Sequence, residues 1–356
     1  MKTKRIMTLA LLMAVAVAGK AQTEVTTFVP GSTLEGISYF LPRTAFRVTI
    51  KADKTVTKPG DFNKYAERYL HLNKVPTTES VRWEIKSITL EPYGVPDMTK
   101  AYSIKLRSKT VAPLVGLSKE GILLSINTDA EETVLPPLPQ ATQDPAPADP
   151  RAFMTQEILS AGSVAKMAEL CAQEIYDIRE SRNALVRGEA DNTPKDGAQL
   201  QLMLNQLAQQ DQALTSLFAG TEHTTHEVFS LTYDPRQETN KEVLFRFSHK
   251  LGILAADDLA GDPIYISLKC TETLPQAVAD EQVAKKKAKM EKGVYYNVPA
   301  RGKLRVFDAD KEYCTLETPM GQFGSVEILS NLLFDKKTNT KVTFFQNTGG
   351  TKDVME

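Results

Sequence analysis

The stretch VRWEIKSITL, residues 81–90, decides the fold, because it alternates apolar and polar side chains and then changes the parity of that alternation. Its first half has apolar residues at odd-numbered positions, which is the period-two pattern of a half-buried strand. Ile88 and Leu90 continue the pattern at even-numbered positions. Both halves can face one core only if an extra residue is inserted between them. We therefore predict a β-bulge near Lys86 and Ser87.

Similar alternation lies on both sides of this stretch. Residues 46–50 and 102–106 predict further strands, and the Gly and Pro within residues 93–97 predict a turn between strands. Residues 62–70 predict a short helix, because their apolar positions fall on one helical face. Residues 22–128 are thus expected to form an N-terminal β-rich domain with one short helix.

The segment 129–152 has a different composition. It holds Pro136, Pro137, Pro139, Pro145, Pro147 and Pro150. Proline at this density can continue neither a helix nor a central strand, so we predict an extended, semi-rigid linker. We place the main domain boundary here.

Residues 153–220 carry two amphipathic helical stripes. Apolar side chains recur at spacings of three and four in residues 161–185 and again in residues 200–218. Turn residues between Gly188 and Gly197 separate the two stripes. Both stripes are narrow, which favours two antiparallel helices that pack on each other as a long hairpin.

Short alternating segments return in residues 221–356, which we expect to form a C-terminal β-rich domain. Short strands separated by turns are typical of an antiparallel sandwich or barrel. The predicted fold class is therefore α+β: two antiparallel β-rich units, sandwich- or barrel-like, with a long antiparallel helical hairpin between them.

Residues 1–21 have the layout of a cleavable signal peptide. A basic start at residues 2–5 precedes an apolar run at residues 6–18, and small residues surround a cleavage site near Ala21. The thirteen residues of this run, apolar apart from Thr8, span only about 20 Å as a helix, which is short of a bilayer core of about 30 Å. We expect export to the periplasm, the cell exterior or the outer membrane.

The charge of the mature chain argues against nucleic-acid binding. Cleavage removes four basic and no acidic side chains from 43 Lys and Arg and 44 Asp and Glu, so the formal charge changes from −1 to −5. Nucleic-acid binding requires a surplus of positive charge that neutralises phosphates. After residue 21, no run of 18 apolar residues predicts a transmembrane helix.

The chain has three cysteines, Cys171, Cys270 and Cys314. An odd number at wide spacing is no disulfide framework, and free structural cysteines are the preferred interpretation. A disulfide between Cys270 and Cys314 stays open, because both lie in strand-like segments of one region.

His223 and His226 form the most ligand-like cluster. On a helix the two imidazoles would share a face and could bind a metal, but Thr224-Thr225 and the apolar alternation that follows favour a strand. On a strand, residues three apart point to opposite faces. We interpret the cluster as a polar strand start and predict neither a metal site nor a cofactor, with metal binding as the alternative.

Arg179 and Arg182 lie three apart on the first predicted long helix. Either could pair with Glu189 or Asp191 at the hairpin turn, or face solvent. The alternative is a contact with an anion or a partner.

The sequence holds no G-x-S-x-G elbow, no G-x-G-x-x-G loop and no phosphate-binding loop. The preferred hypothesis is therefore a non-enzymatic envelope binding or scaffold protein whose partner is an envelope protein or a glycan. The alternative is a secreted hydrolase that acts on glycan or peptide through carboxylates, since two such residues can lie anywhere in the sequence. A receptor-like module beside an outer-membrane complex is a third hypothesis.

Several stretches carry a family resemblance in collinear order. They are residues 39–46, 59–70, 93–97, 112–117, 175–179, 217–220 and 322–324. The chain resembles domain-of-unknown-function family 4831, a family of secreted proteins from Bacteroidota. The resemblance covers essentially the whole mature chain and implies a location in the envelope of a Gram-negative bacterium. It implies no activity, catalytic residue or ligand.

Overall fold

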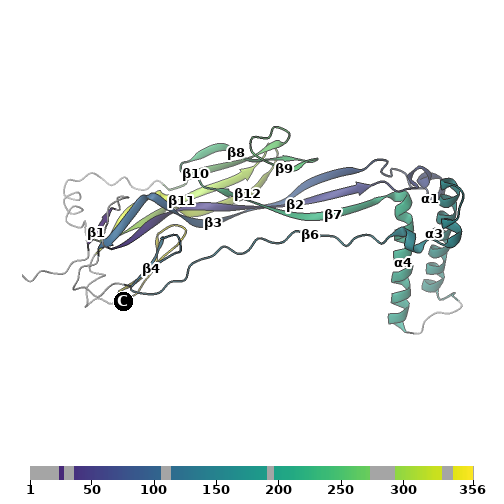
Figure 1. Cartoon of the computed structure of the whole chain (residues 1–356), viewed down its shortest axis with the longest axis horizontal. Coiled ribbons are helices and arrows are strands. Elements are labelled where there is room, and N and C mark those ends of the chain that lie inside the picture. The colour runs from purple at the N-terminus through teal and green to yellow at the C-terminus, as the bar shows by residue number, and fades with distance from the viewer. Residues whose placement is uncertain are drawn as a thin grey trace, which may run out of the picture.

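The computed structural model describes residues 24–27, 36–105, 114–190, 196–272, 293–330 and 340–355. The molecule is elongated, with a β-rich base at one end and a group of helices at the other (Figure 1). Long strands run between the two ends, and the two long helices lie roughly perpendicular to these strands. We call the helical end the head. The predicted signal peptide and its cleavage site lie outside the described residues.

Two long strands set the length of the molecule. β2 (Ile37–Lys58) and β3 (Ser80–Lys105) pair antiparallel from Ile37 to Thr57. At about 3.3 Å per residue, the 22 residues of β2 span roughly 70 Å. β7 (Thr221–Tyr233) pairs with the other edge of β2, while β1 (Glu24–Thr27) and β6 (Thr142–Gln143) complete the sheet at its two sides.

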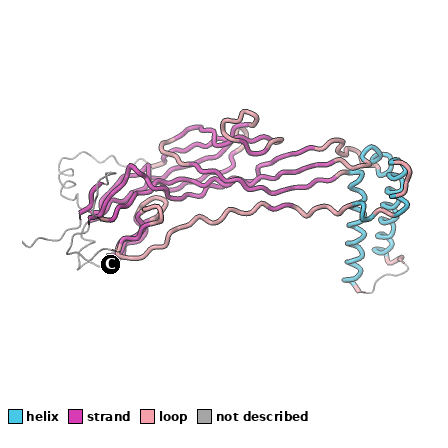
Figure 2. Tube along the Cα trace, in the orientation of Figure 1, coloured by secondary structure: helices cyan, strands magenta, loops and turns pink. Residues whose placement is uncertain are grey.

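Two further sheets pack at the base, and every strand pairing within the three sheets is antiparallel. The second sheet has the order β12 (Glu312–Ser330), β11 (Gly293–Phe307), β10 (Asp262–Cys270), β8 (Thr239–Ser248) and β9 (Gly252–Leu254). The third has the order β14 (Thr351–Met355), β13 (Lys341–Phe344), β5 (Leu123–Ile126) and β4 (Val115–Leu117). The α+β prediction with antiparallel sheets is confirmed, and no closed barrel forms among the described strands (Figure 2).

The first and second sheets bury the main core between them. Phe46, Val48 and Ile50 of β2 are fully buried against side chains such as Ile266 of β10 and Leu304 of β11. Burial of a side chain of this size contributes about 1.5–3 kcal/mol. Residues 46–52 of β2 therefore use their even-numbered face for this core, whereas Tyr39 and Leu41, nearer the start of β2, are buried in a second core that includes Ile126 of β5 and Val342 of β13.

The predicted bulge is confirmed at Lys86. Lys51 pairs with Ser87, whereas the next residue, Ala52, pairs with Ile85. Lys86 is the extra residue, which lets Ile85 and Ile88 both reach the core.

The turn predicted at residues 93–97 is wrong, because these residues continue β3. Tyr93 pairs with Ala45 and Pro96 pairs with Pro42 before the register shifts. β3 is an edge strand at this point, since β1 pairs only with residues 102–105. Prolines are tolerated on an edge, where the missing N–H leaves no ladder bond unmade.

The head is built from helices on both sides of residues 80–149 in the sequence. They are η1 (Asn63–Tyr65), α1 (Ala66–Leu70), η2 (Pro150–Phe153), α2 (Gln156–Leu159), α3 (Val164–Arg187) and α4 (Gly197–Ala219). Phe62, Cys171, Ile175, Leu214 and Phe218 are buried together in its core. Ser163 caps the start of α3 and Gly188 ends it in the left-handed conformation, so the helix ends follow local sequence.

Strands from both sides of the helical pair share sheets. β7, which follows α4, pairs with β2, and β13 near the end of the chain pairs with β5. The described strands of residues 22–128 and of residues 221–356 are therefore interleaved in space. All three cysteines are free.

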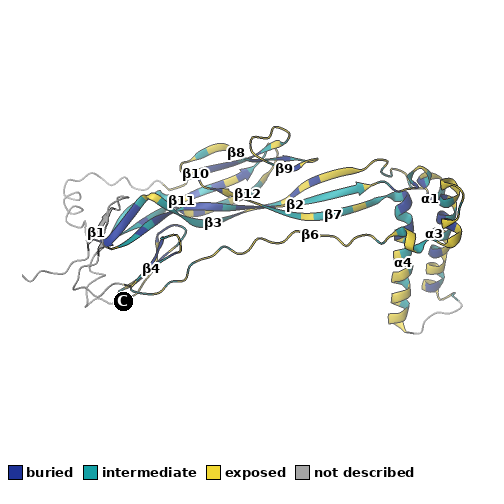
Figure 3. Ribbon diagram, in the orientation of Figure 1, coloured by how far each residue is buried: buried dark blue, intermediate teal, exposed yellow. Residues whose placement is uncertain are grey.

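Between the base and the head the sheet forms a neck, which we define as residues 54–58, 80–82 and 221–225. Every neck residue is exposed or half-buried, in contrast to the buried base (Figure 3). Thr55 and Thr224 bond to each other through their hydroxyls across the sheet. Threonine suits such a strand because its branched side chain favours the extended backbone while its hydroxyl stays solvated.

A second connection runs beside the neck. We call residues 129–149 the strap, because this extended segment runs from the base to the head and pairs with the sheet as a strand only at β6 (Figure 1).

Candidate functional site

The free end of α4 exposes a surface without charge. Residues 197–210 contain no Asp, Glu, Lys or Arg, although residues 197–199, 201–203 and 205–206 are exposed. The neighbouring end of α3, by contrast, carries Glu180, Arg182 and Arg187. Depletion of charge on an exposed surface is the compositional mark of the centre of a protein interface.

Two faces of α4 carry large apolar side chains. Leu200, Leu204 and Leu207 are half-buried and continue the stripe of Leu214 and Phe218 that packs in the core of the head. Leu202 lies roughly opposite that stripe, since a helix turns by about 100° per residue. Its side chain is 69% exposed. Leu202 is thus an apolar side chain that the fold itself does not use.

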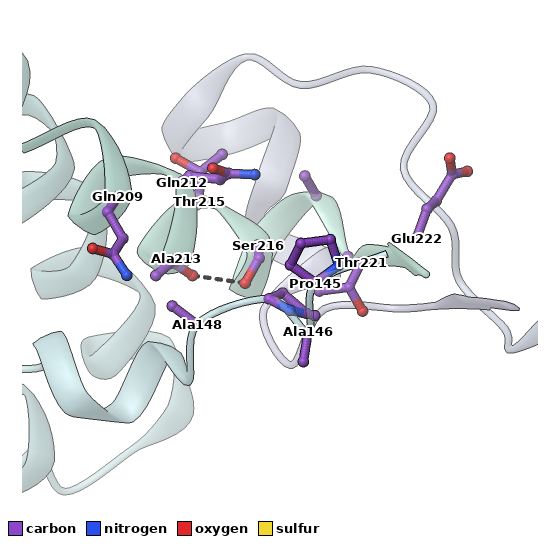
Figure 4. A pocket seen from close by; sticks show the side chains of 13 residues that line it. Pro145, Ala146, Ala148, Gln209, Gln212, Ala213, Thr215, Ser216, Thr221 and Glu222 are labelled. Atoms are coloured by element: carbon purple, nitrogen blue, oxygen red, sulfur yellow. Dashed lines mark hydrogen bonds between the residues drawn. The ribbon is translucent and has the colours of Figure 1, made fainter. Parts of the chain in front are cut away.

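A groove of about 470 Å³ continues this outer face toward the neck. In Figure 4, Pro145, Ala146 and Ala148 of the strap lie across from Gln209 and Ser216 of α4.

The wall on the α4 side of this groove offers free amide groups. Ser216 uses its own hydroxyl on the carbonyl of Ala213. The amides of Gln209 and Gln212 have no hydrogen-bond partner within the described part of the chain. Glu222 of β7 is the one charged residue of the groove lining. The groove therefore offers small apolar groups and amides to a ligand.

Arg179 does not pair with Glu189 as considered from the sequence. Its guanidinium donates to the carboxylate of Asp211 at 2.9 Å and to the hydroxyl of Thr215 at 3.3 Å, both on α4. Glu189 lies 3.9 Å from Arg187, and Arg182 is exposed. Arg179 therefore ties the two helices together, because the interhelical register places a carboxylate beside it.

The His223–His226 segment is a strand, as predicted. His223 pairs with Val56 and His226 with Asp53, so the two imidazoles point to opposite faces of the sheet. The described residues contain no group of three or more His, Cys, Asp or Glu side chains placed to hold a metal ion.

His226 instead joins three elements. Its Nδ1 atom lies 2.7 Å from Asp53 on β2, and its Nε2 atom lies 3.5 Å from Asp144 on the strap. The hydrogen bond to Asp53 raises the pKa of His226, and Asp144 adds to the effect.

A comparison of the sequence with known protein families finds one that matches most of the chain. The family described as a domain of unknown function (DUF4831) matches residues 35–352. The chain belongs to this family. The DUF4831 match spans the neck, the strap, the head and the base apart from β1 and the end of β14. Neither a curated protein nor a solved structure matches the chain.

None of the described helices of this DUF4831 member combines the length and apolar character needed to cross a membrane. Sequence reasoning identified His226 and Arg179 but missed their partners Asp53, Asp144 and Asp211. The partners lie far from them in the sequence, and no local pattern marks them. The uncharged run of residues 197–210 was visible in the sequence, and it is the signal that could have located the exposed face of α4.

Proposed function

We propose that this DUF4831 protein is a non-enzymatic binding or scaffold protein of the cell envelope, and that its head carries the surface that contacts a protein partner. Export through residues 1–21 and an origin in the envelope of a Bacteroidota species are parts of the same proposal. The observation that carries it is the exposed, uncharged face of α4, with Leu202 at its centre.

The energetics favour burial of this face. Complete burial of a leucine side chain contributes about 1.5–3 kcal/mol. Because Leu202 is mostly exposed, a partner that covers it would gain most of this free energy. No charged side chain of residues 197–210 has to lose water when a partner binds. The partner surface that fits is itself apolar and uncharged, with amide or hydroxyl groups that can pair with the glutamines.

The shape supports a scaffold role. β2, β3 and β7 continue through the neck as one hydrogen-bonded sheet, so the head is held at a distance from the base by paired strands. The strap adds a second connection between the same two ends (Figure 1). Such an arrangement presents a binding surface away from whatever the base contacts.

The test is capture of partners from the native envelope with the full mature chain and a chemical cross-linker, followed by mass spectrometry. The variant Leu202→Glu places a charge in the centre of the α4 face. The matched control is Leu259→Glu, because Leu259 is also an exposed leucine, at 82%, in the turn before β10.

We expect the wild type and the Leu259→Glu variant to capture the same protein, with cross-links in α4, and the Leu202→Glu variant to lose it. Capture of that protein by all three chains would contradict the proposal. Recovery of cleaved glycan or peptide fragments alone would contradict it too and would favour a hydrolase.

A further inference from the structure

The strap is held by a few polar contacts. The backbone N–H of Thr133 donates to Gln346 at 2.6 Å, and Arg47 donates to the carbonyl of Pro136 at 2.7 Å. Further along, the N–H of Asp144 donates to the carbonyl of Thr224 at 3.0 Å, beside the two-residue strand β6. All residues from 136 to 147 are exposed, so no apolar core holds this part of the strap.

His226 lies where the strap meets the sheet. It contacts Asp53 of β2 at 2.7 Å on one side of the imidazole and Asp144 of the strap at 3.5 Å on the other. From β3, Lys86 lies 3.6 Å from Asp53 and 3.0 Å from Glu84. We propose that His226 is a proton-operated latch, which fastens the strap to the sheet when the imidazole is charged and releases it when the imidazole is neutral.

The hydrogen-bonding capacity of histidine explains the switch. A neutral imidazole has one N–H, and an imidazolium has two. Asp53 takes the proton on Nδ1, because it is the nearer carboxylate and belongs to the paired sheet. In the neutral ring, Nε2 would then present a lone pair to the carboxylate of Asp144, and the two would repel each other. Only the charged ring attracts both carboxylates at once.

The pKa direction agrees with this geometry. The hydrogen bond to Asp53 raises the pKa of His226, and the contact with Asp144 raises it further. A raised pKa means that the latch is fully closed below the ordinary histidine value of about 6.5 and is lost as the pH rises through the raised value. Lys86 is the other cation beside Asp53, at 3.6 Å from its carboxylate.

Release of the strap changes a groove on the same face of the sheet. This groove of about 540 Å³ is bounded on one side by residues 139–142 of the strap and on the other by Lys51, Asp53, Lys86 and His226. One wall of the groove therefore depends on the closed strap. The protonation of His226 controls access to this part of the β2–β7 sheet.

The test is hydrogen–deuterium exchange of residues 140–147 in the full mature chain at pH 5.5 and pH 8.5, corrected for the intrinsic dependence of exchange on pH. The wild-type strap should exchange about 1.5- to 5-fold faster at pH 8.5, as expected when one solvent-exposed ion pair is lost. Asp144→Asn and His226→Gln should exchange fast at both values. Asp129→Asn, on the same strap, is the matched control and should behave like the wild type.

A second measurement tests the contact between His226 and Asp144 directly, in case a substitution alters the fold. Titration of His226 by NMR should give a lower pKa in Asp144→Asn than in the wild type. Equal protection of the strap at both pH values in the wild type would overturn the proposal. So would a pH dependence that persists in His226→Gln, because another group would then be responsible.

Discussion

The Nη2 atom of Arg179 lies 2.9 Å from the Oδ1 atom of Asp211, and this ion pair joins α3 to α4. The Nε atom of Arg179 also donates to the Oδ2 atom of the same carboxylate at 3.2 Å, so the contact is bidentate. Bidentate arginine–carboxylate pairs are stronger than ordinary surface pairs. We predict that Arg179→Ala lowers the free energy of unfolding of the head by about 1 kcal/mol.

Urea unfolding followed by circular dichroism at 222 nm measures this change, because the described long helices lie in the head. Arg182→Ala, three residues along on the same helix, is the control and should leave the midpoint unchanged. Equal effects of the two substitutions would show that the ion pair does not hold the hairpin.

Gly252 and Trp83 mark the end of the base nearest the neck. Gly252 has φ +86°, and a Cβ atom there would lie 2.8 Å from the indole ring of Trp83. We predict that Gly252→Ala lowers the free energy of unfolding by about 1–3 kcal/mol, through backbone strain and displacement of the indole. Trp83 is the single tryptophan of the chain, so its fluorescence reports the change directly.

Gly162→Ala is the control for that substitution, because nothing lies within 4 Å of a Cβ atom at this position and its φ is not positive. An unchanged emission maximum in Gly252→Ala would contradict the packing described here.

The three cysteines should differ in reactivity. Burial raises the pKa of the Cys171 thiol to about 11, with a smaller contribution from Glu174. The thiolate is the reactive form, so Cys171 should resist alkylation by iodoacetamide at pH 8 until the head unfolds. Cys270, which is half-buried, should react first. Mass spectrometry of a time course separates the sites, and alkylation of Cys171 in the folded chain at the rate of Cys270 would refute the prediction.

Arg43 and Asp234 should make stability depend on pH. The hydrogen bond from Arg43 lowers the pKa of Asp234, outweighing the effect of burial. A lowered carboxylate pKa stabilises the fold above the ordinary value of about 3.9 and is lost as the pH falls through the lowered value. Asp234→Asn should therefore cost about 1 kcal/mol at pH 7 and less at pH 2.

Urea midpoints at the two pH values measure this difference, with Asp257→Asn in an exposed turn as the control. If Asp234→Asn lowers the free energy of unfolding equally at pH 7 and pH 2, the effect comes from packing and not from the charge of Asp234.

Features fixed by local pattern could be predicted from the sequence. The parity change between Ile85 and Ile88 located the bulge, because a buried face demands strict alternation. The stripes of residues 161–185 and 200–218 located the helical pair, because each stripe needs a partner. The spacing of apolar and charged residues therefore predicts local structure, but it does not predict which distant segments pair.

Features fixed by long-range pairing could not be predicted. Nothing in the sequence of β7 indicates that it pairs with β2, which lies more than 150 residues away. The same limit hid Asp53 and Asp144 from His226. The continuous strand at residues 93–97 was missed because Gly and Pro favour turns, and only the edge position of β3 makes them tolerable.

The most direct test of the central claim, that the uncharged face of α4 binds a protein in the envelope, is photo-cross-linking in the native cell. A photoreactive amino acid is placed at Leu202 in one strain and at Leu259 in another, and adducts are resolved by mass. The account predicts a discrete adduct with one protein from position 202 and none from position 259. No adduct from position 202, or the same adducts from both positions, would contradict it.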